Sequence, residues 1–338
     1  MSENLFYKNE NGSIKIKKYE SLFKEELFSF FINSQINELN DLNIFGNDLT
    51  DDNIKEKLNL LMENENIQIF ILENNKELIG IYFLNNTEKY SYISFIIKKE
   101  SRDKGYGKIG LFLLINELSS NMPNINEYFF KVKKSNIWAN LIILGNNANI
   151  YEENGEEIIY KIEKGNKLWI HRIGINDMPK VMKITNDAKT LLKKNGSLQW
   201  QQGYPNENTF TNDINNKSLY GLYQNNELIG YGAYIYGKDI NYVEIDGKWE
   251  IPANDKDMAI HRVAVEENQH GKNYGIKILK YGILYAKKLG CVTVKVDTHK
   301  NNFPMQKCIQ KSGFIYKGII KILRDKLDNL RYAYEIVL

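Results

Sequence analysis

Two short glycine-rich stretches carry the clearest chemical signal in this sequence of 338 residues. Residues 101–108 read Ser-Arg-Asp-Lys-Gly-Tyr-Gly-Lys, and residues 270–275 read His-Gly-Lys-Asn-Tyr-Gly. Each stretch follows an apolar segment typical of a strand and precedes an amphipathic segment typical of a helix. Such a turn points several backbone N–H groups at one spot, where the helix dipole adds about half a positive charge. Both stretches are therefore predicted to bind a phosphate or pyrophosphate.

The backbone N–H groups of the two turns are expected to hold the phosphates, and Lys104, Lys108 and Lys272 to add positive charge. The residues assigned to this role are Arg102, Lys104, Gly105, Gly107 and Lys108 in the first turn, and His270, Gly271, Lys272, Asn273, Gly275 and Ile276 in the second. Asn273 stands where the first turn has Gly105. Because asparagine tolerates a positive φ better than most residues, the second turn is expected to keep its shape.

The elements around the turns repeat in the same order in both halves. A β-hairpin spans residues 67–82 and another spans 219–231, each with Glu-Leu-Ile-Gly on its return strand. An apolar strand, the glycine turn, a helix, a second strand, a short helix and a closing pair of strands follow each time. The strand–turn–helix–strand unit requires parallel strands, whereas hairpins are antiparallel, so each half is predicted to form a mixed α/β sheet. We place the domains at residues 1–163 and 164–338, joined by a short polar linker.

Composition restricts the class of protein. An apolar content of 43% and a charged content of 26% are typical of a globular chain, and a net charge of +3 gives no reason to expect nucleic acid or a membrane surface as partner. The two cysteines and four histidines have neither disulfide nor zinc spacing, so no metal is expected. The N-terminus does not resemble a secretion signal. We expect a cytoplasmic protein, as a monomer or homodimer.

On these residues the chain resembles the GNAT superfamily, the Gcn5-related N-acetyltransferases. Arg102-x-x-Gly105-x-Gly107 matches the family signature in full, whereas the second turn departs from it at His270 and Asn273. Residues 297–314, with Asn302 at the start of a helix and Gly-Phe at its end, resemble the closing motif of the family. The resemblance covers nearly the whole chain. It implies two tandem GNAT-like domains, each a mixed, mostly antiparallel sheet with a splayed parallel pair of strands flanked by helices.

The resemblance also implies a cofactor and a reaction. Acetyl-CoA would lay its pantetheine arm along the main chain of one parallel strand, at Phe95 to Ile97 or at Val263 to Val265, and against Asn302. An N-acetyltransferase of this kind moves an acetyl group to a primary amine of a small molecule or peptide by direct attack in a ternary complex. We expect the second half to be the catalyst, with both halves able to hold CoA.

Proton transfer needs a base, because an alkylammonium with a pKa of about 10.4 is almost entirely protonated at neutral pH. The candidates are His261, Glu244 and His299, although His299 also suits a capping role and Glu244 a surface charge. Many members of the family protonate the leaving thiolate with a tyrosine. Ile309 and Leu144 stand at that position in the two halves, so proton delivery falls to water or another residue.

Trp200 and Tyr204 lie in a Gly-Pro loop and either line an acceptor pocket or anchor the loop. Two alternatives to acetyl transfer remain open. One is a non-catalytic acyl-CoA-binding or scaffolding protein, which the missing tyrosine favours. The other is transfer of an amino-acid or longer acyl group, a reaction that a related tandem fold performs. The leading expectation is an acyltransferase for acyl groups other than aminoacyl.

Overall fold

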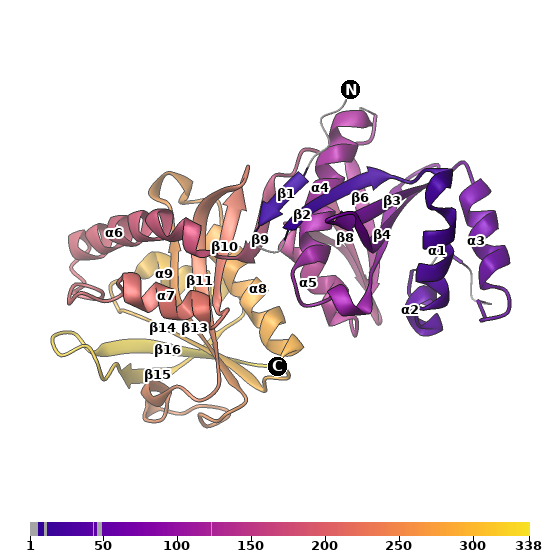
Figure 1. Ribbon diagram of the computed structural model, residues 1–338. Coiled ribbons are helices and arrows are strands. Elements are labelled where there is room, and N and C mark those ends of the chain that lie inside the picture. The colour runs from indigo at the N-terminus through magenta and orange to yellow at the C-terminus, as the bar shows by residue number, and fades with distance from the viewer. Residues whose placement is uncertain (1–5, 10–11, 43, 46–48, 123) are drawn as a thin grey trace. The chain divides into compact units, whose positions relative to one another are not determined.

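Each half of the chain folds around its own mixed β-sheet in the computed structural model (Figure 1), which describes residues 6–9, 12–42, 44–45, 49–122 and 124–338. The chain divides into an N-terminal unit, Met1–Lys167, and a C-terminal unit, Leu168–Leu338. The domain limits predicted from the sequence, 1–163 and 164–338, stay a prediction.

In chain order, the helices and strands of the N-terminal unit are β1 (Phe6–Asn9), β2 (Gly12–Lys18), α1 (Lys24–Ile32), α2 (Ile36–Asn40), α3 (Ile54–Glu63), β3 (Ile67–Asn74), β4 (Glu77–Asn86), β5 (Ser91–Ile97), α4 (Tyr106–Asn121), β6 (Glu127–Lys133), α5 (Ile137–Gly145), β7 (Asn149–Asn154) and β8 (Glu157–Glu163). Those of the C-terminal unit are β9 (Leu168–Arg172), α6 (Met178–Lys194), α7 (Glu207–Asn215), β10 (Leu219–Gln224), β11 (Glu227–Tyr236), β12 (Asp246–Gly247), β13 (Asp257–Val265), α8 (Tyr274–Lys288), β14 (Thr293–Thr298), α9 (Phe303–Lys311), β15 (Ile315–Lys321) and β16 (Leu330–Val337).

The two sheets share one topology over seven strands, in which β2-β3-β4-β5-β6-β8-β7 corresponds to β9-β10-β11-β13-β14-β16-β15, and β1 and β12 are additional edge strands at opposite ends. Their strand orders are β1-β2-β3-β4-β5-β6-β8-β7 and, in the same direction, β9-β10-β11-β13-β14-β16-β15-β12. Neighbouring strands are antiparallel except for one parallel pair in each sheet, β5 with β6 and β13 with β14. This confirms the predicted fold class, two tandem units of mostly antiparallel sheet with one parallel pair flanked by helices.

The hairpins at β3–β4 and β10–β11 turn in the same way, with a positive φ at both residues of each turn. Asn75 and Lys76 have φ of 51° and 74°, and Asn225 and Asn226 have φ of 51° and 66°. A two-residue turn with positive φ at both positions matches the right-handed twist of the flanking strands. The sequence repeat is thus a repeat of backbone geometry.

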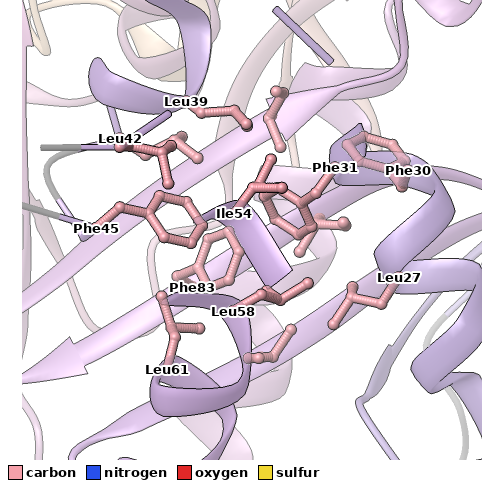
Figure 2. Packing of buried hydrophobic residues seen from close by; sticks show 14 residues of the cluster. Leu27, Phe30, Phe31, Leu39, Leu42, Phe45, Ile54, Leu58, Leu61 and Phe83 are labelled. Carbon is pink, nitrogen blue, oxygen red and sulfur yellow. The ribbon is translucent and has the colours of Figure 1, made fainter. Parts of the chain in front are cut away.

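Helices cover both faces of each sheet. In the N-terminal unit, Ile81 and Phe83 of β4 join the buried cluster beneath α1 and α3 (Figure 2), whereas the Tyr82 hydroxyl donates to Gly107 of α4, 2.8 Å away. Alternate residues of a strand point to opposite faces, so α4 lies on the other side from α1 and α3. Among the described residues, no helix has the length and apolarity needed to cross a membrane.

A buried ion cluster stabilises the parallel pair of the C-terminal unit. The Lys295 side chain is fully buried, and its Nζ lies 2.8 Å from Asp257 Oδ2 and 3.5 Å from Glu335 Oε1. These residues lie on β14, β13 and β16, so the three charges connect three neighbouring strands at the centre of the sheet. A buried lysine needs such partners because a charge away from water is costly unless it is paired.

Candidate functional site

A cavity of about 710 Å³ opens in the C-terminal unit where its parallel strands separate. Strands β13 and β14 pair from Asp257 with Thr293 to Ile260 with Val296, and their next residues diverge. Residues 261–265 of β13 line one side of the cavity, and Asp297 and Thr298 of β14 line the other. The volume lies within the usual range for a small-molecule site, about 300–1,000 Å³.

A bulge distinguishes β13 from its counterpart in the N-terminal unit. His261 pairs with Ala233 and Ala264 with Tyr231, so Arg262 and Val263 both stand opposite Gly232. Arg262 takes a left-handed φ of 54° at this point. In contrast, β5 pairs with β4 without interruption from Ser91 to Ile97. A bulge leaves backbone groups of the extra residue outside the ladder, and of the two strands it is β13 whose pairing with the preceding strand is interrupted in this way, beside the cavity.

The two glycine-rich turns have the same backbone shape although their glycines differ in position. Asp103 and Gly105 have φ of 63° and 82°, and Gly271 and Asn273 have φ of 82° and 61°. Counted from Arg102 and from His270, the second and fourth residues of each turn are left-handed, and one of these two residues is a glycine. Helix α8 then begins at Tyr274, and its first N–H groups precede any intrahelical partner. His270, Gly271, Asn273, Gly275 and Ile276 line the cavity, whereas Lys272 is not among the lining residues.

His270 and Arg102 make the same contact in their respective turns. The His270 Nε2 lies 2.9 Å from the Val265 carbonyl oxygen, and the Arg102 Nε donates over 2.9 Å to the carbonyl of Ile97. Both side chains therefore tie the turn to the last residue of the preceding strand. The loss of a permanent charge at His270 does not remove this contact, which the sequence did not reveal.

The helix that follows β14 begins with the predicted asparagine. Asn302 Oδ1 caps α9 by accepting from the Met305 N–H at 3.3 Å, and Asn302 lines the cavity. Ile309, at the position where the family often has tyrosine, is fully buried in the core. Cys308 lines the cavity, and burial raises the pKa of its thiol, so it stays protonated and unsuited to act as a nucleophile.

His261 lies between two carboxylates at the start of the separated strands. Its Nε2 is 2.7 Å from Asp239 Oδ2, and its Nδ1 is 3.8 Å from Asp297 Oδ1. Burial opposes ionisation of Asp239, but hydrogen bonds from His261 and Asn241 outweigh it and hold the pKa of this carboxyl well below its usual value. An ionised carboxylate only accepts, so the His261 Nε2 carries a proton and Nδ1 of the neutral ring has a lone pair. His261 and Asp297 line the cavity.

The other two candidate bases lie differently. Glu244 is exposed, and it is not among the cavity-lining residues of the described chain. His299 is 2% exposed, and both of its ring nitrogens are engaged: Nε2 with Asp328 Oδ1 at 3.1 Å, and Nδ1 as acceptor of the Asn301 N–H at 3.1 Å. Burial also lowers the pKa of His299. The geometry gives neither residue the access to the cavity that a base requires.

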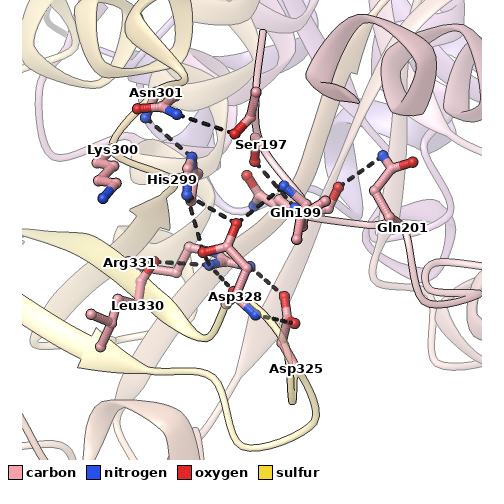
Figure 3. A network of polar contacts seen from close by, with 12 residues as sticks. Ser197, Gln199, Gln201, His299, Lys300, Asn301, Asp325, Asp328, Leu330 and Arg331 are labelled. Atoms are coloured by element: carbon pink, nitrogen blue, oxygen red, sulfur yellow. Dashed lines mark hydrogen bonds and ion pairs between the residues drawn. The ribbon is translucent and has the colours of Figure 1, made fainter. Parts of the chain in front are cut away.

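His299 instead belongs to a network that fixes two loops around the cavity (Figure 3). Asp328 Oδ2 accepts from the Leu198 N–H at 3.1 Å, and Asp325 accepts from Gln202 and Arg331 at 2.9 and 2.7 Å. These bonds connect residues 196–202 with the loop between β15 and β16. The network was not foreseen, because its members are far apart in the sequence.

The loop that this network holds carries Trp200 and Tyr204, both of which line the cavity. The Tyr204 hydroxyl accepts from Arg262 Nη1 at 2.6 Å, and the Arg324 guanidinium lies 3.8 Å from the centre of the Tyr204 ring. Arg262 also pairs with Asp213 of α7, with Nη2 2.9 Å from Oδ1. The bulge residue thus anchors the aromatic loop through the Tyr204 hydroxyl, while Arg324 stacks on the Tyr204 ring.

The N-terminal unit covers its separated strands with its own chain. Strands β5 and β6 pair only at Ser91 with Tyr128 and Tyr92 with Phe129. Residues 36–42 and 44–45, here the covering segment, contact both strands beyond that point. Glu38 holds the Arg102 guanidinium with two contacts of 2.7 Å, Asp41 pairs with Lys133 at 2.7 Å, and the Leu42 carbonyl accepts from Ser94 Oγ at 2.8 Å.

Apolar side chains of the covering segment complete this closure. Leu39, Leu42 and Phe45 are buried in one cluster with Phe83 and Ile96 (Figure 2).

The predicted phosphate-turn residues of the N-terminal unit differ in exposure. Lys104 is exposed, Gly105 is half-buried, and Gly107 and Lys108 lie in the buried first turn of α4. A Cβ at Gly107 would come within 2.6 Å of Ile142, so this glycine permits close packing of helices. Of the strand positions, Phe95 packs against Tyr82 with tilted rings whose centres are 5.5 Å apart, and Ile97 is buried.

Comparison with known proteins gives a family for the C-terminal unit. Residues 183–314 match the model of the acetyltransferase (GNAT) family. Among solved structures, the chain is similar to a GNAT-family acetyltransferase from Streptococcus agalactiae, with 29% identity, 51% of this chain and 95% of that one covered, and a TM-score of 0.46. A ribosomal-protein-alanine N-acetyltransferase from Brucella melitensis has 16% identity, coverage of 50% and 99%, and a TM-score of 0.39. No curated protein matches the chain.

Proposed function

We propose, from the match of residues 183–314 to the acetyltransferase (GNAT) family model, that the C-terminal unit transfers an acetyl group from acetyl-CoA to a primary amine. The acceptor would be a small molecule or a peptide. The observation that carries the proposal is the cavity at the separated strands, lined by both the α8 entry turn and the His261–Asp297 pair. Bound acetyl-CoA would supply the thioester whose acetyl group is transferred.

The residues that would hold this cofactor fit its chemistry. The N–H groups of residues 271–276 suit a pyrophosphate, with Lys272 adding charge from the exposed side of the turn. Gly271 faces open space where a Cβ would stand. The main chain from Val263 to Val265, beside the bulge, suits an extended pantetheine arm, and the Asn302 side chain lies at the start of α9 on the same cavity.

His261 would act as the base that removes the proton of the acceptor ammonium. Its Nδ1 has the lone pair, while Asp239 orients the ring from the other side. After proton transfer, the imidazolium faces two carboxylates, Asp239 and Asp297, which stabilise its charge. Direct transfer to the amine would be favoured over an acyl-enzyme through Cys308, whose thiol is protonated, and the departing CoA thiolate would take its proton from water.

Asn273 offers a matched test of cofactor binding, because only its backbone conformation is special. Asn273→Gly keeps the left-handed conformation at no steric cost and should bind CoA with unchanged or improved affinity. Asn273→Val places a β-branched residue there at a cost of about 1–3 kcal/mol, so the Kd for CoA should rise about tenfold or more. Isothermal titration calorimetry measures both. Equal affinities for the two variants would contradict the phosphate-binding role of the turn.

The same titration is expected to give one CoA for each chain. In the N-terminal unit, β5 has no bulge, Arg102 is paired with Glu38, and the carboxylates Glu38 and Asp41 would repel a pyrophosphate. Two equivalent sites would show that the covering segment moves aside. Acceptor-dependent release of CoA separates the transferase from a non-catalytic acyl-CoA-binding protein, the alternative that Ile309 at the tyrosine position favours.

A further inference from the structure

We propose that Arg324 binds a carboxylate carried by the acceptor, so that the acceptor class is an amine that also bears an anionic group, such as an amino acid or a short peptide. This inference rests on the proposed acetyl transfer to an amine in the same cavity. It concerns specificity, which the family likeness leaves open. It depends on how positive and negative side chains are paired around the cavity.

Arg324 differs from the other arginines that line the cavity. Arg262 is bound to Asp213 and Tyr204, and Arg331 is bound to Asp325 at 2.7 Å. For Arg324, no hydrogen bond or ion pair is found among the residues that the structure describes; its recorded contact is the stacking on the Tyr204 ring. The neighbouring Asp325 is already engaged by Arg331, Gln202 and the Asp328 N–H. Arg324 therefore presents an unneutralised planar cation to the cavity.

Stacking leaves the hydrogen-bonding edge of Arg324 available. A guanidinium over an aromatic face is held by the ring while its N–H groups point outward in its own plane. This fork matches the two oxygens of a carboxylate. Tyr204 is itself fixed, because Arg262 donates to its hydroxyl at 2.6 Å. Arg324 is thus supported by a rigid platform rather than by a carboxylate of the protein.

The opposite charge lies nearby on the same cavity. The Leu323 N–H donates to Asn241 Oδ1 at 2.9 Å, and the Asn241 side chain donates to Asp239, the partner of His261. The loop that carries Arg324 is thereby attached to the segment that carries Asp239. His261 has a carboxylate on each side, Asp239 behind the cavity lining and Asp297 within it, while Arg324 adds a cation to the same lining. An acceptor with an ammonium and a carboxylate complements both, whereas a second ammonium would meet Arg324 unfavourably.

The experiment compares acceptors that differ only in this charge. Amino acids and ω-amino carboxylates of increasing length are assayed beside their carboxamides, with kcat/KM expressed per unprotonated amine and the KM for acetyl-CoA measured in parallel. Aminoalkyl phosphate esters form a third arm, which distinguishes phosphate from carboxylate as the anion. The variants are R324Q, R324K and, as the matched control, K326Q, an exposed lysine of the same loop that is not among the lining residues.

In the native protein, the best carboxylate should exceed its carboxamide by about tenfold or more, since the site then pairs a charge that the amide leaves unpaired. R324Q should abolish this preference, because the variant offers the carboxylate no cation to pair with, and the KM for acetyl-CoA reports whether the cofactor side of the cavity is affected. R324K should retain part of the preference, and K326Q all of it. Calorimetry with the same acceptors and CoA should reproduce the preference in binding, without turnover.

Three outcomes would overturn the inference. Equal use of carboxylates and carboxamides would leave acetyl transfer intact but remove Arg324 from acceptor recognition. A preference for phosphate esters would replace carboxylate by phosphate, and a raised KM for acetyl-CoA in R324Q would assign Arg324 to the cofactor. If CoA is not released with any acceptor, the proposed acetyl transfer fails instead. Calorimetry of the same acceptors with the native protein and R324Q then decides whether Arg324 selects anions.

Discussion

Replacing His261 with glutamine is expected to lower kcat/KM for an amine acceptor by about 10²–10⁴ at neutral pH, the range that a positioned general base contributes. Glutamine keeps a polar side chain of similar reach but cannot accept the proton of an ammonium. The Kd for CoA should change little, because the phosphate-binding turn and the bulge are separate from the His261 ring. Steady-state kinetics together with CoA titration measure the two effects.

The pH dependence gives the sharper readout. An amine with a pKa of about 10.4 loses its own proton as the pH rises, so the need for a base diminishes. The ratio of native to H261Q rates should therefore fall steadily between neutral pH and pH about 10. Glu244→Gln is the matched control, since Glu244 is exposed and outside the cavity lining of the described chain. A ratio independent of pH would remove His261 from the role of base.

Replacing Lys295 with methionine is expected to destabilise the C-terminal unit by about 3–5 kcal/mol, the usual cost of removing one partner of a buried ion pair. Methionine fills the space of the lysine stem but leaves Asp257 and Glu335, which are 3% and 1% exposed, without their shared cation. Trp249 lies against this cluster, with Lys295 Nζ 5.2 Å from its ring centre, so its fluorescence reports the local transition during urea unfolding.

A surface lysine provides the comparison for the K295M variant. Lys183→Met is the control. Lys183 is 60% exposed and pairs with Asp187 at 3.4 Å, and such surface pairs contribute only about 0–1 kcal/mol. A loss for K295M as small as that of K183M would show that the three buried charges do not stabilise the sheet as a unit.

The covering segment accounts for a structural difference between the two units of the tandem. Seven strands follow the same order in both units, and both have the same left-handed positions before the long helix. Within the described part of the chain, the bulged strand beside a cavity is β13 of the C-terminal unit. In the N-terminal unit, Glu38 and Leu42 accept the hydrogen bonds of Arg102 and Ser94, which would otherwise be available to a ligand at the separated strands. The better match to the family signature, Arg102-x-x-Gly105-x-Gly107, therefore stands in the unit whose separated strands are covered by its own chain.

The sequence by itself determined the elements, their order and the turn geometry. Alternating and helical apolar patterns set the strands and helices, and Asn225, Asn226 and Asn273 adopt positive φ because asparagine tolerates it, which is a local property. The short strand β12, the helix α2 and the bulge at Arg262 lay beyond that reasoning, because tertiary contacts rather than local preference hold them.

Only the tertiary structure decided which of the chemically capable residues meet. The sequence offers three equivalent candidate bases: His261, Glu244 and His299. In the fold, His261 is paired with a carboxylate beside the cavity, both ring nitrogens of His299 are used in hydrogen bonds, and Glu244 is exposed to solvent. Asp239 and Arg324 carry no signal in the sequence, since their roles depend on loops that are distant along the chain and adjacent in space. Charge pairing acts over a few ångströms, so it is fixed by packing and not by spacing along the chain.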